Sequence, residues 1–246
     1  MNTKNDSIVN QMYWDDGYEK QQLEVASEND PIRKLIMKYI PRGGGGGIEI
    51  GAYPCRYLAI FGELGYTLNG IDTTEKIESN ELKDWIKQNN WNYEILRKIN
   101  FLDFKTDKKF DIVCSFGFIE HFEKWDEIIR KHAVLVKEGG YLILSTPNFA
   151  GLLQRILHVL TDIYNYKRHI IQSMNPKKWM DVLGKNYKII YIGYFDSFMF
   201  WVGDQKRNII QKLIVKCFSV LGKILKKFPN CGVYSPFCGL IVKKLS

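Results

Sequence analysis

Short apolar runs alternate with amphipathic stretches along most of the chain from Ile48 onward. The apolar runs predict strands, and the stretches between them place apolar residues at helical spacing. Strands separated by helices in this rhythm are typical of a parallel sheet with right-handed crossovers. The strands predicted in the first part of the chain are Ile48–Ile50, Thr67–Ile71, Tyr93–Ile99, Phe110–Ser115 and Tyr141–Ser145.

Helical patterns fill the gaps between these strands. A further helix is predicted after Pro31, because Pro suits a first helical turn and the apolar residues that follow it recur at helical spacing. Gly139 and Gly140 are expected to end the helix before the fifth strand. The helices predicted between the strands are Tyr57–Leu64, Glu75–Asn89 and Asp126–Val136.

The last hundred residues add elements to both the helical layers and the sheet. A helix is predicted over Phe149–Tyr166, a sixth strand over Lys188–Tyr194 and a seventh over Gly239–Lys243. Asp204–Phe228 is a long amphipathic stretch whose lysines lie mostly off the apolar stripe. The pattern therefore predicts one α/β domain, a Rossmann-like, mostly parallel seven-stranded sheet flanked by helices, with helical additions at both ends.

The composition is that of an ordinary globular protein with a basic charge. Of the 246 residues, 46% are hydrophobic and 25% are charged, and the formal net charge is +8. The excess of positive charge favours acidic partners such as phosphates, nucleotides or anionic membrane surfaces, without choosing among them. Five cysteines without a CxxC pair, a polar start and no long uncharged run predict a cytoplasmic protein without a spanning helix.

The turn after the first predicted strand is the first candidate for a ligand site. Ligands of open α/β sheets bind beyond the carboxyl ends of the strands, where the strand order reverses. Gly51 can adopt a positive φ angle or let a ligand approach the backbone, and the Glu49 carboxylate can hold a ligand ammonium group. The other candidates in this turn are Ala52, Tyr53 and Arg56.

Acidic residues also follow the second and third predicted strands. Asp72, with Thr73 beside it, stands about twenty residues after the turn, where a carboxylate can accept both hydroxyl groups of a ribose. Asp103, with Leu102 beside it, can accept a hydrogen bond from an adenine amino group. Each carboxylate alone is equally compatible with an ordinary strand-end cap. Their phasing behind successive strands favours a nucleoside site.

A run of five glycines, Gly43–Gly47, precedes the first strand. It lacks the GKS or GKT ending of a phosphate-binding P-loop. We therefore interpret the run as a flexible connector and not as a phosphate cradle.

The order of these motifs resembles that of the class I S-adenosylmethionine-dependent methyltransferases, from about Ile48 to the C-terminus. In the first motif, Tyr53 and Cys55 stand where that family usually has its second and third loop glycines. The motifs that carry the resemblance are IEIGAYPCR at 48–56, GID at 70–72, NFLDF at 100–104, FDIVCSFGFIEHF at 110–122 and LVKEGGYLILSTPN at 135–148.

The resemblance implies S-adenosylmethionine as cofactor and in-line transfer of its methyl group. It adds Phe116, at the end of the fourth strand, to the cofactor-binding candidates. It also divides the single domain 1–246 into a helical N-terminal segment (1–41), a cofactor-binding core (42–147) and a substrate-covering part (148–246). Three motifs of this last part resemble methyltransferases associated with polysaccharide modification or natural products.

Histidines are the candidates for a general base, because their side chains titrate near neutral pH. His121 follows the fourth strand, beside the expected sulfonium, and is the first candidate for base or substrate ligand. His169 lies in the part expected to cover the substrate, and Glu120 can orient a substrate group or cap its loop. No cluster of metal ligands is evident, so we expect no metal.

Several functions remain open from the sequence. The first is O-methylation of a small-molecule or carbohydrate-type acceptor. The second is N-methylation, or methylation of a lipid-like or quinone-like substrate near a membrane. The 204–228 helix either packs on the domain or docks on such a membrane. The third is a binding subunit without activity. Nucleic acid is not favoured as a partner, and the oligomeric state is open.

Overall fold

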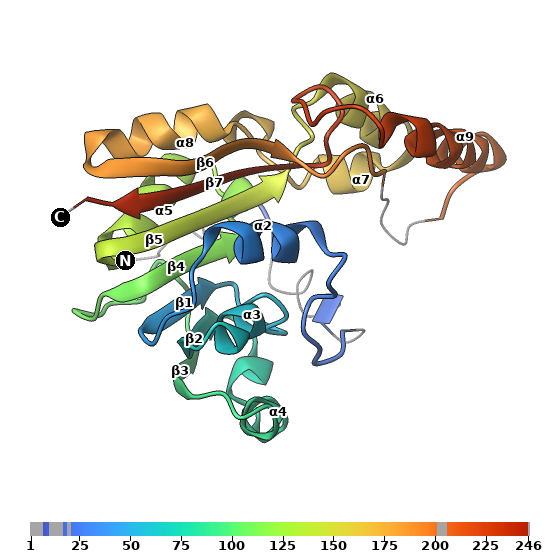
Figure 1. Cartoon of the computed structure of the whole chain (residues 1–246). Helices are drawn as coiled ribbons and strands as arrows, with labels where there is room; N and C mark the ends of the chain where they lie inside the picture. Colours follow the sequence, from blue (N-terminus) through green and yellow to red (C-terminus); the bar gives the residue numbers. More distant parts are fainter. Residues whose placement is uncertain (1–6, 10–16, 19–20, 201–205, 246) are drawn as a thin grey trace, which may run out of the picture.

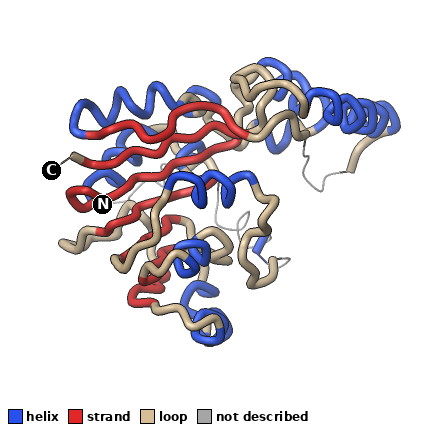
Figure 2. The backbone as a smooth tube through the Cα atoms, viewed as in Figure 1, coloured by secondary structure: helices blue, strands red, loops and turns tan. Residues whose placement is uncertain are grey.

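A seven-stranded sheet forms the centre of the computed structural model, with helices on both faces (Figures 1 and 2). The structure describes residues 7–9, 17–18, 21–200 and 206–245. The strands are β1 (Gly46–Ile50), β2 (Thr67–Asp72), β3 (Tyr93–Lys98), β4 (Phe110–Phe116), β5 (Val136–Pro147), β6 (Tyr187–Phe195) and β7 (Phe237–Lys244). All seven predicted strands are therefore confirmed.

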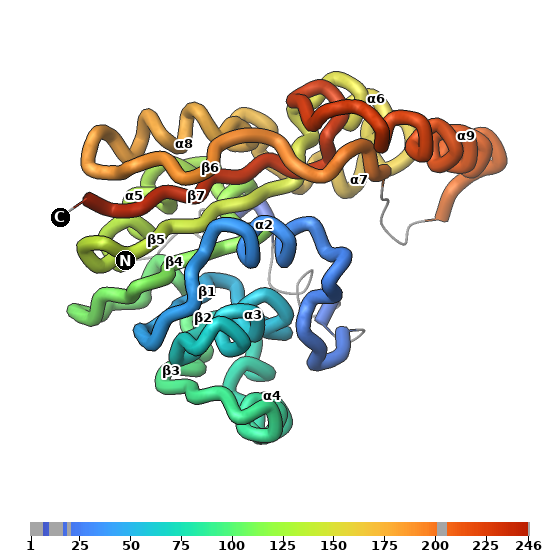
Figure 3. The backbone as a smooth tube through the Cα atoms, viewed as in Figure 1, coloured from blue at the N-terminus to red at the C-terminus, as the bar shows by residue number. Residues whose placement is uncertain are grey.

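The spatial order of the strands is β3-β2-β1-β4-β5-β7-β6. The first five strands are parallel, and β7 runs antiparallel between β5 and β6. Figure 3 shows the C-terminal strand entering this gap. The strand order reverses between β1 and β4, so their carboxyl ends border the crevice in which such sheets bind ligands.

Helices cover the two faces of the sheet in separate groups. The α-helices are α2 (Pro31–Tyr39), α3 (Leu58–Glu63), α4 (Asn80–Gln88), α5 (Trp125–Leu135), α6 (Leu152–Thr161), α7 (Ile163–Tyr166), α8 (Pro176–Leu183) and α9 (Ile209–Leu225). Short 3₁₀ turns lie at η1 (Glu75–Glu78), η2 (Ile119–His121), η3 (Ile171–Ser173) and η4 (Gly184–Asn186).

Burial on both faces explains the apolar runs in the central strands β4 and β5. Along β4, Val113 points into a core shared with α5 and α8, whereas Ile112 and Cys114 point into a core shared with α2, α3 and α4. Leu142 and Ile143 of β5 divide between the two cores in the same way. A strand whose two faces are both covered needs apolar residues at every position.

Four predicted boundaries were wrong. β5 begins at Val136 and contains the glycine pair, with Gly139 at a φ of 75°. The helix predicted over 75–89 divides at Ser79, which caps α4. The helix predicted over 149–166 begins only at Leu152 and divides at Asp162. The amphipathic helix predicted over 204–228 spans Ile209–Leu225, and residues 204 and 205 lie outside the described residues.

The glycine run is part of the fold, which corrects its interpretation as a flexible connector. Gly46 and Gly47 belong to β1. A Cβ atom on Gly45 would lie 2.0 Å from an Asp111 side-chain oxygen, which accepts a hydrogen bond from the Gly46 amide at 3.0 Å. Gly45 is therefore a position of close approach, where a side chain has no room.

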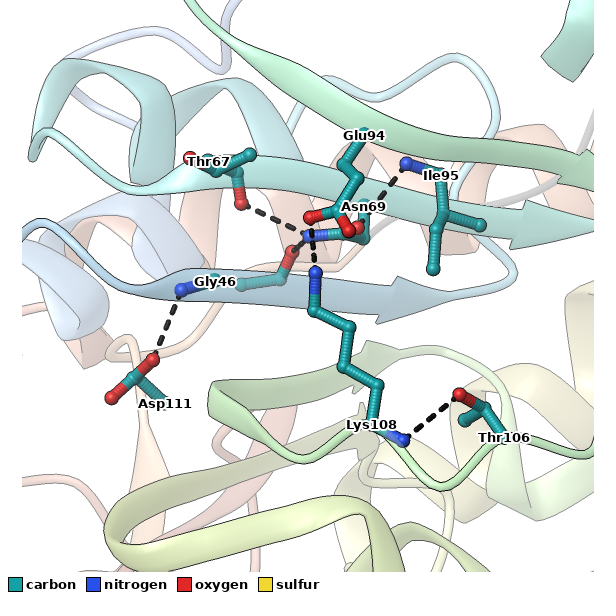
Figure 4. A network of polar contacts seen from close by, with 9 residues as sticks. Gly46, Thr67, Asn69, Glu94, Ile95, Thr106, Lys108 and Asp111 are labelled. Atoms are coloured by element: carbon teal, nitrogen blue, oxygen red, sulfur yellow. Dashed lines mark hydrogen bonds and ion pairs between the residues drawn. The ribbon is translucent and has the colours of Figure 1, made fainter.

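Buried Asn69 of β2 links three neighbouring strands (Figure 4). Its Nδ2 donates to the carbonyl groups of Gly47 at 3.1 Å and Thr67 at 3.2 Å, and its Oδ1 accepts from the Ile95 amide at 3.2 Å. The register between β2 and β3 shifts at this residue. The side chain therefore supplies polar partners where the ladder between the strands is irregular.

We predict that Asn69→Leu lowers the free energy of unfolding by about 1–3 kcal/mol, because it leaves buried backbone groups without partners. The exposed Asn29 offers a matched control, and Asn29→Leu should change the free energy by no more than about 0.5 kcal/mol. Urea unfolding followed by circular dichroism measures both values. Equal stabilities of the two variants would contradict the role given to Asn69.

Candidate active site

A cavity of about 390 Å³ lies at the carboxyl ends of β1, β2 and β4. Its volume is within the range of pockets that bind small ligands and cofactors. Loops after the first four strands and parts of the N-terminal segment enclose it. The lining comprises Ser7, Val9, Gly17, Tyr18, Gln21, Glu49, Ile50, Gly51, Ala52, Tyr53, Pro54, Arg56, Tyr57, Ile71, Asp72, Thr73, Ile99, Asn100, Phe101, Phe116, Gly117, Phe118 and Phe122.

Gly51 shapes the floor of the cavity after β1. Its φ of 71° lies in the left-handed region that favours glycine. A Cβ atom at this position would lie 3.0 Å from the Phe118 ring. The glycine therefore allows the loop after β1 and the loop after β4 to approach each other at the point where the strand order reverses.

Asp72 is buried at the end of β2 and already accepts several hydrogen bonds. The Tyr53 and Thr74 amides donate to its carboxylate at 3.1 Å each, and the Tyr18 hydroxyl donates at 3.2 Å. Burial raises the pKa of Asp72 above its ordinary value, and the bonds from these amides and from Tyr18 act in the opposite direction. The Tyr18 hydroxyl occupies a position of the kind that a ribose hydroxyl would take.

Glu49 presents an unsatisfied oxygen at the end of β1. Its Oε2 is buried and has no hydrogen-bond partner among the described residues. Burial raises the pKa of Glu49 well above its usual range; a hydrogen bond from the Leu58 amide lowers it, and the nearby Asp72 carboxylate raises it further. Two buried carboxylates in one cavity favour a cationic ligand, because a positive group would offset the cost of burying them.

Arg56 contributes a donor to the same cavity. Its Nη2 lies 3.3 Å from an Asp30 side-chain oxygen, whereas its Nε is buried without a hydrogen-bond partner among the described residues. Glu49 and Arg56 both line the cavity, and each has one buried polar atom without a hydrogen-bond partner among the described residues. A ligand with both an ammonium and a carboxylate group, such as an amino acid moiety, would complement the opposite charges of these two side chains.

The structure brings together most of the cofactor-binding candidates from the sequence. Leu102 and Asp103 are the exceptions, since neither lines the cavity. The candidates that do line it are Glu49, Gly51, Ala52, Tyr53, Arg56, Asp72, Thr73 and Phe116.

The placement of Asp103 corrects the expectation that it reaches the same cleft as Asp72. A tight turn follows β3, in which the Asp103 amide donates to the Asn100 carbonyl at 3.0 Å. The turn leaves Asp103 exposed and within electrostatic reach of Lys131. Leu102 lines a separate cavity of about 190 Å³ beside Lys131. Asn100 and Phe101 face the main cavity instead.

Among the lining residues that the sequence did not identify, three shape the cavity through their contacts or position. Asn100 is the first polar residue after β3, and this position could have identified it. Phe118 packs edge-on against Phe101 with ring centroids 5.9 Å apart. Tyr18 comes from the N-terminal segment and packs edge-on against Tyr53 at 5.1 Å. No local pattern links Tyr18 to Asp72, because 54 residues separate them.

The catalytic candidates lie together, but they do not line the cavity. Glu120, His121 and His169 are 0%, 3% and 9% exposed. The His121 Nδ1 lies 2.9 Å from the Arg168 carbonyl oxygen. Burial, followed by the neighbouring His169, lowers the pKa of His121 to about 3. The geometry therefore does not support His121 as a general base within the cavity.

The N-terminal segment, and not the C-terminal part, covers the cavity in the described residues. Residues 7, 9, 17, 18 and 21 line it, whereas no described residue after Phe122 does. The Ile8 amide donates to the His121 carbonyl at 2.8 Å, and Ser7 forms a β-bridge with Phe122. These bonds hold the segment against the loop after β4. The cavity lining therefore does not support the prediction that residues 148–246 cover the substrate.

Comparison with known proteins places the chain among methyltransferases. Residues 23–186 match the family model described as a methyltransferase domain. Over 79 residues the chain is 33% identical to the mitochondrial ubiquinone biosynthesis O-methyltransferase of Dictyostelium discoideum, a match that covers 31% of this chain and 25% of the relative. The chain therefore spans only about a quarter of that relative's length.

Solved methyltransferase structures share the fold. A putative methyltransferase from Bacillus halodurans C-125 superposes with a TM-score of 0.59 at 16% identity, over 87% of this chain and 98% of the other. Coclaurine N-methyltransferase bound to N-methylheliamine and SAH superposes with a TM-score of 0.57 at 10% identity, over 89% and 75% of the two chains. At these identities the similarity establishes the fold.

We predict that Asp72→Asn weakens binding of S-adenosylhomocysteine by about 10–100-fold, because a hydrogen bond to a charged group contributes about 1.5–3 kcal/mol. The exposed Asp103 provides the matched control, and Asp103→Asn should leave the affinity within about twofold. Isothermal titration calorimetry measures both. A loss of affinity in the Asp103 variant alone would restore the adenine role that the sequence suggests and contradict the geometry.

Proposed function

The chain belongs to the methyltransferase domain family, and from this premise we propose that it transfers the methyl group of S-adenosylmethionine to an oxygen of a small-molecule or carbohydrate-type acceptor. The observation that carries the proposal is the cavity at the switch point of the sheet, in which buried Glu49 and Asp72 lie at the ends of neighbouring strands. These carboxylates complement a cofactor that carries positive charge and ribose hydroxyl groups.

The residues present fit this cofactor group by group. We expect Asp72 to accept the ribose hydroxyls; in this structure its carboxylate accepts a hydrogen bond from the Tyr18 hydroxyl at 3.2 Å. The Glu49 carboxylate suits the ammonium group, and the Arg56 guanidinium suits the carboxylate, since both residues line the cavity. Phe101 supplies an apolar ring to the lining near the end of β3, which suits a base.

Alignment is the main contribution that these residues make. When bound, S-adenosylmethionine supplies a methyl group that is already activated by its sulfonium, for displacement in line by an acceptor oxygen. Holding the two reactants in this geometry can lower the barrier by roughly 7–11 kcal/mol. The rings of Phe116, Phe118 and Phe122 in the lining limit the access of water to the reacting groups. We assign no base to His121, because its ring lies outside this lining.

The choice of oxygen over nitrogen rests on the relative from Dictyostelium discoideum, whose name describes an O-methyltransferase. The aligned segment is short, so the relative supports oxygen as the acceptor atom but does not identify the acceptor molecule. An acceptor of the carbohydrate type is supported by the sequence motifs of the C-terminal part. An N-methyltransferase of similar fold shows that the fold itself is compatible with either atom.

A lipid-like acceptor at a membrane surface is a second candidate, favoured by the helices beyond the end of the sheet. In Figure 1, α6, α7 and α9 lie together past the tip of β5. Among the described residues, no helix has the length and apolar character needed to cross a bilayer. The exposed large apolar residues of these helices, with Phe228 shortly after α9, are Leu152, Ile156, Val159, Leu160, Ile163, Tyr164, Ile209, Ile210, Leu213, Val220, Leu221, Ile224 and Phe228.

The charge of this region fits an anionic membrane. Lys212, Lys216 and Lys223 are exposed on α9, and Lys226 and Lys227 follow at its end. No acidic residue occurs anywhere after Asp204. An exposed apolar face flanked by lysines is typical of helices that lie at the surface of an anionic bilayer.

The test of the proposal is a transfer assay with S-adenosylmethionine that carries a deuterated methyl group. The purified protein is incubated with cell extract divided into lipid-soluble and water-soluble fractions, and mass spectrometry detects labelled products. We expect a labelled methyl ether or ester. Label on nitrogen would contradict O-methylation. Binding of S-adenosylhomocysteine without any transfer would indicate a binding domain without activity.

The same assay separates the two sources of acceptor. If the acceptor resides in a membrane, the label enters the lipid fraction, and the protein sediments with vesicles of phosphatidylcholine and phosphatidylglycerol but not with phosphatidylcholine alone. Lys216→Glu combined with Lys223→Glu should then abolish sedimentation. Label in the water-soluble fraction and no sedimentation would exclude the lipid-like acceptor.

A further inference from the structure

Three buried side chains, Glu120, His121 and His169, converge behind the wall of the main cavity. One potential ligand atom from each lies within 4.8 Å of the other two. The two imidazole ring centroids are 4.7 Å apart. A Cβ atom on Gly117, which lines the cavity, would lie only 3.6 Å from the Glu120 Oε1. The cluster is therefore separate from the cavity but adjacent to it.

The hydrogen bonds of the two histidines fix which ring nitrogen carries the proton. The His121 Nδ1 lies 2.9 Å from the Arg168 carbonyl oxygen, and the His169 Nδ1 lies 2.8 Å from the Asn165 carbonyl oxygen. A carbonyl oxygen only accepts, so both Nδ1 atoms donate and both Nε2 atoms keep a lone pair. Metal-binding histidines are oriented by backbone carbonyl groups in this same way.

Glu120 supplies the part of the cluster that lacks a partner. Both of its carboxylate oxygens are buried, and neither has a hydrogen-bond partner among the described residues. A buried carboxylate without a partner is costly, so it needs either a proton or a cation. The nearby imidazole nitrogens that keep lone pairs are acceptors as well and cannot supply the missing donor.

We propose that Glu120, His121 and His169 bind one divalent transition-metal ion. Two imidazoles and one carboxylate are a ligand set that suits zinc and its first-row neighbours more than calcium or magnesium. Three protein ligands leave at least one coordination position for water or another oxygen. This site lies outside the cofactor cavity and does not depend on the proposed function.

The ion joins two segments that are distant in sequence. Glu120 and His121 belong to η2, directly after β4, whereas His169 precedes η3. The Ile170 amide already donates to the Glu120 carbonyl at 2.7 Å, so the backbones are held together beside the proposed ligands. A bound ion therefore fixes the segment around His169 against the loop that shapes the cavity. The sequence led us to expect no metal, and this proposal replaces that expectation.

The proposal is tested on the full chain, freed of metal with a chelator and titrated with zinc chloride by calorimetry. We expect one ion per chain. Glu120→Gln and His169→Gln should each weaken zinc binding by more than about 100-fold, since losing even an outer partner of a ligand costs about 10–100-fold. His132 provides a matched control, because it is also buried and also bonded through Nδ1 to a backbone carbonyl. His132→Gln should retain the affinity.

A second measurement on the unmodified chain covers variants that fail to fold. X-ray absorption of the zinc-loaded protein should show two imidazole nitrogens in the coordination shell, and cobalt in place of zinc should give visible absorption bands. The proposal is overturned if the folded chain binds neither ion. It is equally overturned if Glu120→Gln binds zinc as tightly as the original chain. A third contradicting result is a chain that binds no zinc and whose thermal midpoint rises with Glu120→Gln, because the carboxyl group then needs only a proton.

Discussion

The burial of two carboxylates at the ends of neighbouring parallel strands is the constraint on which the site depends. Glu49 is the penultimate residue of β1 and Asp72 is the last residue of β2, and burial raises the pKa of both. Parallel pairing places these ends at the same edge of the sheet, and the reversal of strand order opens the cavity beside them. Keeping these buried carboxylates charged therefore costs free energy, and a cationic nucleoside ligand would offset that cost.

The sequence allowed the sheet and both of these carboxylates to be predicted, whereas Asp103 was expected beside them and lies elsewhere. All seven strands were identified, and the central ones were the easiest to recognise because burial on both faces leaves apolar runs. Asp72 was identified because its position follows directly from the end of a strand. Asp103 was misplaced because its position depends on a turn: the chain folds back at Asn100 and carries Asp103 to the surface. The periodicity of apolar residues contains no information about such a turn.

Contacts between distant segments were beyond the reach of local patterns. Tyr18 reaches Asp72 from the N-terminal segment, and His169 lies beside Glu120 although α5, β5, α6 and α7 separate them in the sequence. The histidines were singled out for a base because they titrate near neutral pH, yet burial lowers the pKa of His121 to about 3. The same burial is what makes the cluster around Glu120 a candidate for an ion.

The most direct test of this account is a crystal structure of the chain with S-adenosylhomocysteine. We predict ribose hydroxyls on the Asp72 carboxylate in place of the Tyr18 hydroxyl, the amino acid moiety between Glu49 and Arg56, and the base beside Phe101. A nucleoside bound elsewhere, or one held by Asp103 with Asp72 still bonded to Tyr18, would contradict the central claim that the buried strand-end carboxylates bind the cofactor.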